Sequence, residues 1–260
     1  MIPVVSRRGP IVLAHRGGGA EAPENTMAAF EHARSLGVRH IETDAHLTAD
    51  GRVVLSHDDA VDRCFDGTGL IAQLDWREIS RLRHREAPGE KMPLLAEVLE
   101  AFPDMYFNID AKVPGVVEPL IEVIEEHRAA SRTLVASFKE SRLRAVRTRG
   151  SIPTSLGTEA VVRLVGAAKT ATDPSRWCVP GPSQGVVAAQ VPAGFGPLRV
   201  VDRRFVAAAH TLGLAVHVWT IDTAEEVLEL LDCGIDGIVT ERPTMVRDLL
   251  DSRGLWEAPQ

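Results

Sequence analysis

Eight short runs of apolar and β-branched residues, separated by segments with helical spacing, constrain the fold of this 260-residue chain more than any other feature. The runs rarely alternate with polar residues, which is typical of strands buried on both faces of a sheet. They predict strands at 11–14, 40–47, 105–110, 133–137, 153–157, 185–190, 215–221 and 236–240. Helices are predicted between them at 26–36, 115–127, 139–149, 158–169, 202–212, 223–231 and 243–252.

This alternation predicts an α/β fold, a single (β/α)8 TIM barrel over residues 1–260. A doubly wound open sheet would show the same local pattern, but strand number and chain length favour the barrel. Residues 48–104, after the second strand, are too long for a simple connection and are predicted to be an insertion. The insertion holds a strand-like run at 52–58 and helices near 75–85 and 94–102, and residues 171–184 are predicted to form a loop.

Composition excludes several classes of function. The chain is 45% hydrophobic and 25% charged, with a net charge of -7 and no basic block, so nucleic acid is not an expected partner. Its first seventeen residues are interrupted by Arg7, Arg8 and Pro10, which predicts neither a signal peptide nor a stable membrane insertion. The three widely spaced cysteines predict no disulfide framework and no zinc site, as in a cytoplasmic protein. Composition predicts no oligomeric state.

Polar residues follow several of the predicted strands at their carboxyl ends, where barrel enzymes place their active sites. Glu42 and Asp44 are two residues apart on one strand, so their carboxylates point the same way. With Asp110 they form three oxygen donors without a cysteine, which suggests a hard divalent cation, Mg²⁺ or Ca²⁺. The alternative is a set of rim acids in which Asp110 pairs with Lys112.

His15 and His57 are predicted at strand ends facing the same mouth, where imidazoles suit acid–base chemistry near neutral pH. Arg16 and Lys112 supply fixed positive charge for phosphate oxygens. Three glycines after Arg16 let the chain turn, and Asn25 is predicted to cap the helix that starts at residue 26. Together these groups favour phosphoester cleavage.

The segments AHRGGGAEAPENTMAAFEHA, HIETDAHLTADGRVVLSHDDAVDRCFDGTG, FNIDAK and HVWTIDTAEEVLELLDCGIDGIVTERP resemble the glycerophosphodiester phosphodiesterases over about residues 10–250. The resemblance implies a (β/α)8 barrel with an insertion after the second strand. It also implies roles for single residues. These are an acid–base pair at His15 and His57, phosphate contacts at Arg16 and Lys112, metal ligands at Glu42, Asp44 and Asp110, and a substrate pocket that includes Glu24, Asn25 and Trp219.

Asp110 stands where the family has a glutamate, so the third metal ligand is one methylene shorter here. The implied reaction is hydrolysis of a glycerophosphodiester to glycerol 3-phosphate and an alcohol through a cyclic phosphate, within lipid and glycerol metabolism. Two alternatives remain at this point: a lysophospholipase D-type activity on the same barrel, and a phosphate-binding protein built on an inactive barrel. The choice of alcohol, of metal and of the histidine that acts first is not predicted.

Overall fold

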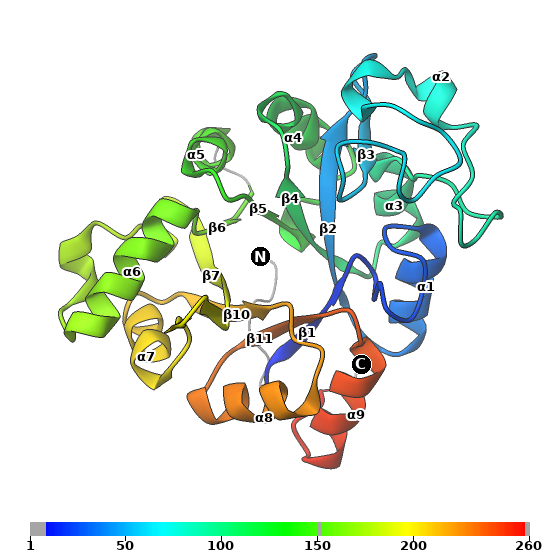
Figure 1. The fold of residues 1–260 in the computed structure, drawn as a ribbon. Helices are drawn as coiled ribbons and strands as arrows, with labels where there is room; N and C mark the ends of the chain where they lie inside the picture. The colour runs from blue at the N-terminus through cyan, green and yellow to red at the C-terminus, as the bar shows by residue number, and fades with distance from the viewer. Residues whose placement is uncertain (1–8, 150–151, 258–260) are drawn as a thin grey trace.

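The computed structural model describes residues 9–149 and 152–257, and within them eight parallel strands close into a barrel (Figure 1). Their order is β1-β11-β10-β7-β6-β5-β4-β2, and pairing of β1 with β2 closes the ring. The predicted barrel is therefore confirmed and the open sheet is excluded. The strands are β1 (Ile11–His15), β2 (His40–Leu47), β4 (Tyr106–Ala111), β5 (Thr133–Ala136), β6 (Thr154–Ser155), β7 (Val186–Pro192), β10 (Ala215–Trp219) and β11 (Gly237–Thr240).

Helices surround the strands on the outside of the barrel, as Figure 1 shows. All seven predicted helices are present, with ends shifted by a few residues: α1 (Met27–Ser35), α4 (Val117–Glu126), α5 (Glu140–Arg149), α6 (Thr158–Thr170), α7 (Arg203–Thr211), α8 (Ala224–Cys233) and α9 (Pro243–Ser252). Their apolar faces bury against the strands. Phe30 of α1, for example, packs edge-on to Phe107 of β4 with ring centroids 6.4 Å apart. Burial of this kind is the main favourable term in holding the two layers together.

The insertion forms a small unit beside β2 with its own apolar core of Val54, Val61, Phe65, Ile71, Ile79 and Met92. It contains β3 (Val53–Leu55), which runs antiparallel to β2, then a 3₁₀ turn (Ile71–Gln73), α2 (Trp76–Ile79) and α3 (Leu95–Ala101). The helix predicted near 75–85 is wrong in length. It ends at Ile79, where the chain makes a turn, and Phe65 then pairs with His84 in an antiparallel bridge.

Irregular segments account for the other differences. The predicted loop at 171–184 contains two 3₁₀ turns, Pro174–Trp177 and Pro182–Gln184, and two more lie at Pro114–Val116 and Ala130–Arg132. A hairpin of β8 (Gly194–Phe195) and β9 (Leu198–Arg199) was not predicted, because two-residue strands leave no detectable periodicity. The strand predicted at 153–157 shortens to β6, and the one predicted at 215–221 ends at Trp219 as β10.

Residues 1–8, 150–151 and 258–260 lie outside the described residues. The predictions for the start of the chain fall largely on the first of these segments. Among the helices of the described part, none combines the length and the apolar character that crossing a membrane requires.

Candidate active site

Strand register brings the predicted acids and His15 together at the carboxyl ends of β1, β2 and β4. His15 is paired with Glu42 across β1 and β2, and Asp44 is paired with Asp110 across β2 and β4. Because the carboxyl ends of all parallel strands open at one mouth, these side chains face a common space. The same register places Asn108 beside Glu42.

The glycines after Arg16 fold the chain tightly against the end of β1. Gly17 and Gly18 have φ of 86° and 99°, backbone angles that residues other than glycine rarely adopt. A Cβ atom on Gly17 would lie 2.7 Å from the Cβ of Ala29, so the loop could not pack on α1 with a larger residue. Arg16 itself has φ of 54° and donates its backbone N–H to the carbonyl of Glu42 at 2.8 Å. The loop therefore holds Arg16 at the mouth.

Asn25 does not cap the helix that follows, contrary to the prediction. It has φ of 54°, and Thr26, in extended conformation, caps α1 by accepting the N–H of Ala29. The buried Asn25 side chain turns inward instead. Its Oδ1 accepts the Thr43 hydroxyl at 2.6 Å, and its Nδ2 donates to Asp44 Oδ2 at 3.4 Å. Asn25 thus orients a carboxylate of the site.

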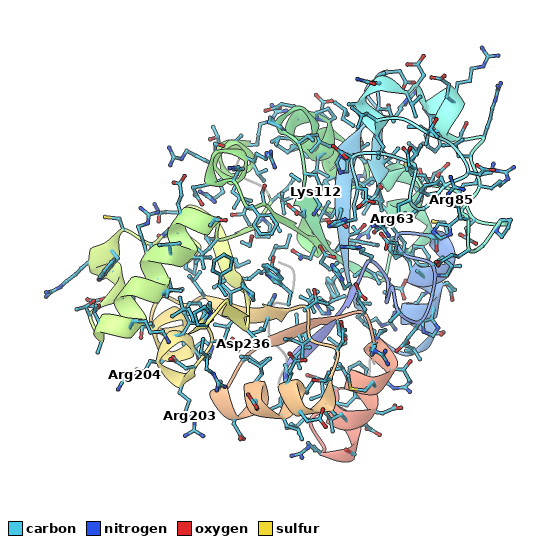
Figure 2. The ribbon with its side chains drawn as sticks, viewed as in Figure 1. Arg63, Arg85, Lys112, Arg203, Arg204 and Asp236 are labelled. Atoms are coloured by element: carbon cyan, nitrogen blue, oxygen red, sulfur yellow. The ribbon has the colours of Figure 1, made fainter. Side chains whose placement is uncertain are left out.

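Lys112, which Figure 2 labels, forms ion pairs with two of the predicted metal ligands. Its Nζ is 2.8 Å from Asp44 Oδ1 and 2.9 Å from Asp110 Oδ2, and the Asp44 side chain is only 2% exposed. Burial opposes the charge on Lys112, but the two carboxylates outweigh it and raise its pKa to about 12. Arg16 adds a second cation, with its Nε 3.5 Å from Asp44 Oδ2.

The site holds more unpartnered buried acceptors than donors. Glu42 Oε2, Asp110 Oδ1 and Asn108 Oδ1 are buried without a hydrogen-bond partner. Burial and the neighbouring Asp44 and Asp110 raise the pKa of Glu42 well above its usual value, and burial likewise raises that of Asp110. Unpartnered carboxylate and amide oxygens are the donor set that a hard cation prefers, so the residues fit Mg²⁺ or Ca²⁺ chemically.

The spacing of the acidic side chains does not match a metal site as the structure stands. In the part of the chain that the structure describes, no three His, Cys, Asp or Glu side chains converge closely enough to hold a metal ion as they stand. The Lys112 ammonium supplies the positive charge between Asp44 and Asp110 in this arrangement.

Each predicted catalytic histidine presents its Nδ1 to a carboxylate. His15 Nδ1 lies 3.2 Å from Glu241 Oε1, and its Nε2 lies 3.7 Å from Glu42 Oε2. Burial, together with the charge of Arg16, lowers the pKa of His15. His57 Nδ1 is 2.7 Å from Asp58 Oδ1. A carboxylate at Nδ1 selects the tautomer that leaves Nε2 free to exchange a proton.

Glu24 is held between two arginines and orients Arg16. Arg16 Nη1 donates to Glu24 at 3.2 Å, and Arg63 binds both Glu24 oxygens. Burial opposes ionisation of Glu24, but the hydrogen bonds from Arg63 and Arg16 lower its pKa. Through Arg63 the contacts continue to Asp58 and His57.

Sequence reasoning missed three members of this network. Asp58 and Glu241 stand inside the segments that carry the family resemblance, so their position next to a predicted catalytic histidine or a strand end was the available signal. Arg63 stands in the same quoted segment as Asp58, but its partner Glu24 lies 39 residues earlier in the chain, so the sequence does not indicate their contact.

Trp219 is the one predicted site residue that no described hydrogen bond or ion pair joins to this network. It ends β10 and packs edge-on to Phe138, with ring centroids 6.0 Å apart. Phe138 follows β5 and is 57% exposed, so the two rings give the far side of the mouth an apolar surface. His46, on the same strand as Glu42 and Asp44, is buried, with its Nε2 3.3 Å from the carbonyl of His57.

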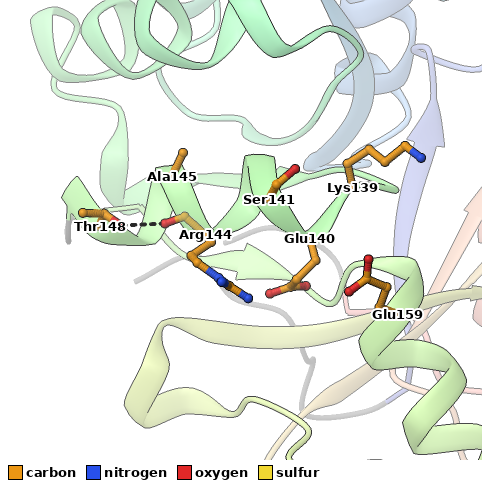
Figure 3. A pocket seen from close by; sticks show the side chains of 7 residues that line it. All are labelled: Lys139, Glu140, Ser141, Arg144, Ala145, Thr148 and Glu159. Carbon is orange, nitrogen blue, oxygen red and sulfur yellow. Dashed lines mark hydrogen bonds between the residues drawn. The ribbon is translucent and has the colours of Figure 1, made fainter.

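A separate pocket on the outer layer does not share these residues. Figure 3 shows it between α5 and the start of α6, lined by Lys139, Glu140, Ser141, Arg144, Ala145, Thr148 and Glu159. The buried carboxylate in it, Glu140, is already bound by Arg147 and by the backbone N–H of Gly157. The pocket therefore leaves this carboxylate no unmet charge for a ligand to satisfy.

Comparison with known proteins agrees with the geometry. The model of the glycerophosphoryl diester phosphodiesterase family matches residues 15–245. A Mycobacterium tuberculosis protein named probable glycerophosphodiester phosphodiesterase 2 is 35% identical over 96% of this chain and 94% of its own length. Human lysophospholipase D GDPD1 is 27% identical over 92% of this chain and 85% of its own. An Oleispira antarctica phosphodiesterase, solved with its product sn-glycerol-3-phosphate, superposes with a TM-score of 0.76 at 24% identity, covering 93% of this chain and 97% of that one.

The fold and its mouth of acids and bases define a (β/α)8-barrel enzyme. The chain belongs to the glycerophosphoryl diester phosphodiesterase family, and it is a hydrolase of phosphoric diesters. The predicted family and the predicted enzyme class are both confirmed, against the alternative of a binding protein on an inactive barrel.

Proposed function

We propose that this enzyme hydrolyses glycerophosphodiesters to glycerol 3-phosphate and an alcohol, with a divalent cation and two histidines. The observation that carries the proposal is that hydrogen bonds and ion pairs join both histidines, the two proposed phosphate-binding cations and the three proposed metal ligands at one barrel mouth. The product named in the Oleispira antarctica structure supports the choice of glycerol 3-phosphate.

The cation would be held by Glu42, Asp44 and Asp110, and it is favoured by the buried oxygens of Glu42 and Asp110 that lack a hydrogen-bond partner. When bound, it lowers the pKa of a substrate hydroxyl and offsets charge on the phosphate. Arg16 and Lys112 bind the phosphoryl oxygens and stabilise the charge that builds there in the transition state. Glu24 and Asn25 keep Arg16 and Asp44 in position for these contacts.

The histidines move the protons. One of His15 and His57 accepts the proton of the glycerol 2-hydroxyl, whose oxygen attacks phosphorus. The bond from phosphorus to the departing alcohol breaks, and the other histidine gives that alcohol its proton. A cyclic phosphate results, and water opens it with the histidine roles reversed to give glycerol 3-phosphate.

The test measures release of glycerol 3-phosphate from glycerophosphocholine during titration with Mg²⁺ or Ca²⁺, and again after chelation. We expect no release without a divalent cation, and none from an analogue that lacks the 2-hydroxyl. His15→Ala and His57→Ala should each lower kcat by at least about 10²-fold with unchanged circular dichroism. The control His210→Ala, on the exposed side of α7, should retain parental turnover. Full activity after chelation would remove the cation from the mechanism.

A second candidate substrate is a lysophospholipid, and two observations favour it. A relative over most of the chain is named a lysophospholipase D, and the Phe138–Trp219 pair offers apolar surface for an acyl chain. Turnover of glycerophosphocholine and of lysophosphatidylcholine should be compared in the parent and in Phe138→Ala. A loss of turnover in Phe138→Ala that is confined to the lysolipid would favour this candidate. If the parent and Phe138→Ala turn over each substrate at the same rate, the candidate is removed.

The prediction of a cytoplasmic enzyme without a nucleic acid partner is retained as part of this proposal, on the three widely spaced cysteines for the compartment and on the net charge of -7 for the partner.

A further inference from the structure

One guanidinium in the insertion binds two carboxylates that come from different parts of the site. Arg63 Nη1 and Nη2 donate to the two oxygens of Glu24 at 2.8 and 2.7 Å. Its Nε donates to Asp58 Oδ2 at 2.5 Å. Figure 2 shows Arg63 on the insertion side of the barrel mouth. A planar fork that satisfies two carboxylates at once fixes their relative position, which a single-point cation does not.

The backbone around Arg63 is held on both sides. Val61 and Phe65 are buried in the core of the insertion, two residues before and two after it. The carbonyl of Asp62 accepts Arg85 Nε at 3.0 Å, and the carbonyl of Cys64 accepts the backbone N–H of Arg85 at 2.8 Å. The guanidinium therefore projects from an anchored turn rather than from a free loop.

Each carboxylate that Arg63 binds touches a residue of the proposed mechanism. Asp58 accepts from His57 Nδ1 through its other oxygen, and Glu24 accepts from Arg16. The hydrogen bond from Arg63 lowers the pKa of Asp58 to about 2, so this carboxylate stays ionised and remains an acceptor for His57. A continuous chain of contacts thus runs from His57 to the arginine that binds phosphate.

We infer that Arg63 is a positioning residue, which fixes the His57–Asp58 pair relative to the Arg16–Glu24 pair so that His57 Nε2 meets the phosphate that Arg16 holds. The inference rests on the proposed function, because it needs His57 to exchange protons with the substrate. Displacing a reacting group by about 1 Å can lower the rate about 10²-fold. Loss of the Arg63 contacts should therefore lower kcat and leave KM nearly unchanged.

The test compares kcat and KM for glycerophosphocholine in Arg63→Ala, Arg63→Lys and Arg85→Ala. Arg85→Ala is the matched control, because it loosens the same turn without touching Glu24 or Asp58. We expect Arg63→Ala to lower kcat about 10- to 100-fold with a small change in KM, and guanidinium ion in the buffer to restore part of it. Arg63→Lys keeps the charge but loses the planar fork, so its kcat should lie between those of the parent and of Arg63→Ala.

A second comparison separates positioning from a purely structural role. If Arg63 acts through His57, adding Arg63→Ala to His57→Ala should cost less than about 3-fold more, whereas independent effects would multiply. Parental kcat in Arg63→Ala, or an equal loss in Arg85→Ala, would overturn the inference. If Arg63→Ala does not fold, Arg63→Lys carries the same comparison. Full activity of His57→Ala would instead mark failure of the proposed function.

Discussion

Replacing Lys112 by methionine removes the cation that two buried carboxylates share. Lys112 Nζ lies 2.8 Å from Asp44 and 2.9 Å from Asp110, whose side chains are 2% and 11% exposed. Methionine fills much of the same volume, so the change is mainly one of charge. The two carboxylates would then repel each other in a site that water reaches poorly.

The expected loss follows from the burial of these groups. Breaking a buried ion pair by removing one partner typically costs about 3–5 kcal/mol, because the remaining charge is left uncompensated. A single domain of 260 residues unfolds with an entropy of about 0.55 kcal/mol per degree. Lys112→Met should therefore lower Tm by about 5–9 °C.

Calorimetric unfolding of the parent, Lys112→Met and the control Lys91→Met measures this directly. Lys91 lies on the exposed surface, and its replacement should shift Tm by little. Saturating Mg²⁺ or Ca²⁺ should raise the Tm of Lys112→Met more than that of the parent, because a bound cation replaces the missing charge. Asp110→Asn in the same chain should recover part of the loss. The reasoning fails if Lys112→Met unfolds no earlier than Lys91→Met.

Three further predictions address single contacts. Asp110→Ala should weaken divalent cation binding sharply in calorimetric titration while Asp110→Glu keeps activity; tight binding by Asp110→Ala would contradict its role as a ligand. Glu241→Gln should lower kcat by less than the about 10²-fold expected for loss of His15 itself, with KM unchanged, because Glu241 only orients the imidazole. The pKa of Asp58 is lowered to about 2, so its stabilising effect is present above about pH 4 and is lost as pH falls through about 2. The gap in unfolding free energy between the parent and Asp58→Asn should be about 1 kcal/mol at pH 6 and should close toward pH 2; a gap independent of pH would refute the Asp58 contact.

The barrel could be predicted from the sequence because its signal is local and repeated. Each strand needs only four to eight apolar residues buried on both faces, and each helix needs one apolar stripe, so the period of the pattern identifies both. Segments without a long enough period were the ones predicted wrongly. The β8–β9 hairpin has two residues in each strand, and the helix predicted near 75–85 stops at Ile79, where pairing of Phe65 with His84 competes.

Residues at strand ends could also be predicted, because strand order alone brings them to one mouth. The placement of His15, Glu42, Asp44 and Asp110 followed from parity along each strand and from the fold class. Asn25 was placed correctly at the mouth, but its role as a helix cap was wrong. An Asn side chain suits both a cap and a buried hydrogen bond, and only the position of Thr43 and Asp44 decides between them.

The sequence by itself therefore determined the alternation of strands and helices, the barrel, and the residue types at its carboxyl ends. Only the tertiary structure decided which of those residues bind one another: Lys112 to Asp44 and Asp110, and Arg63 to Glu24 and Asp58. The physical reason is one of range. Strand and helix patterns arise from contacts within a few residues, whereas the partner of a charged side chain is set by packing between segments that lie far apart in the chain.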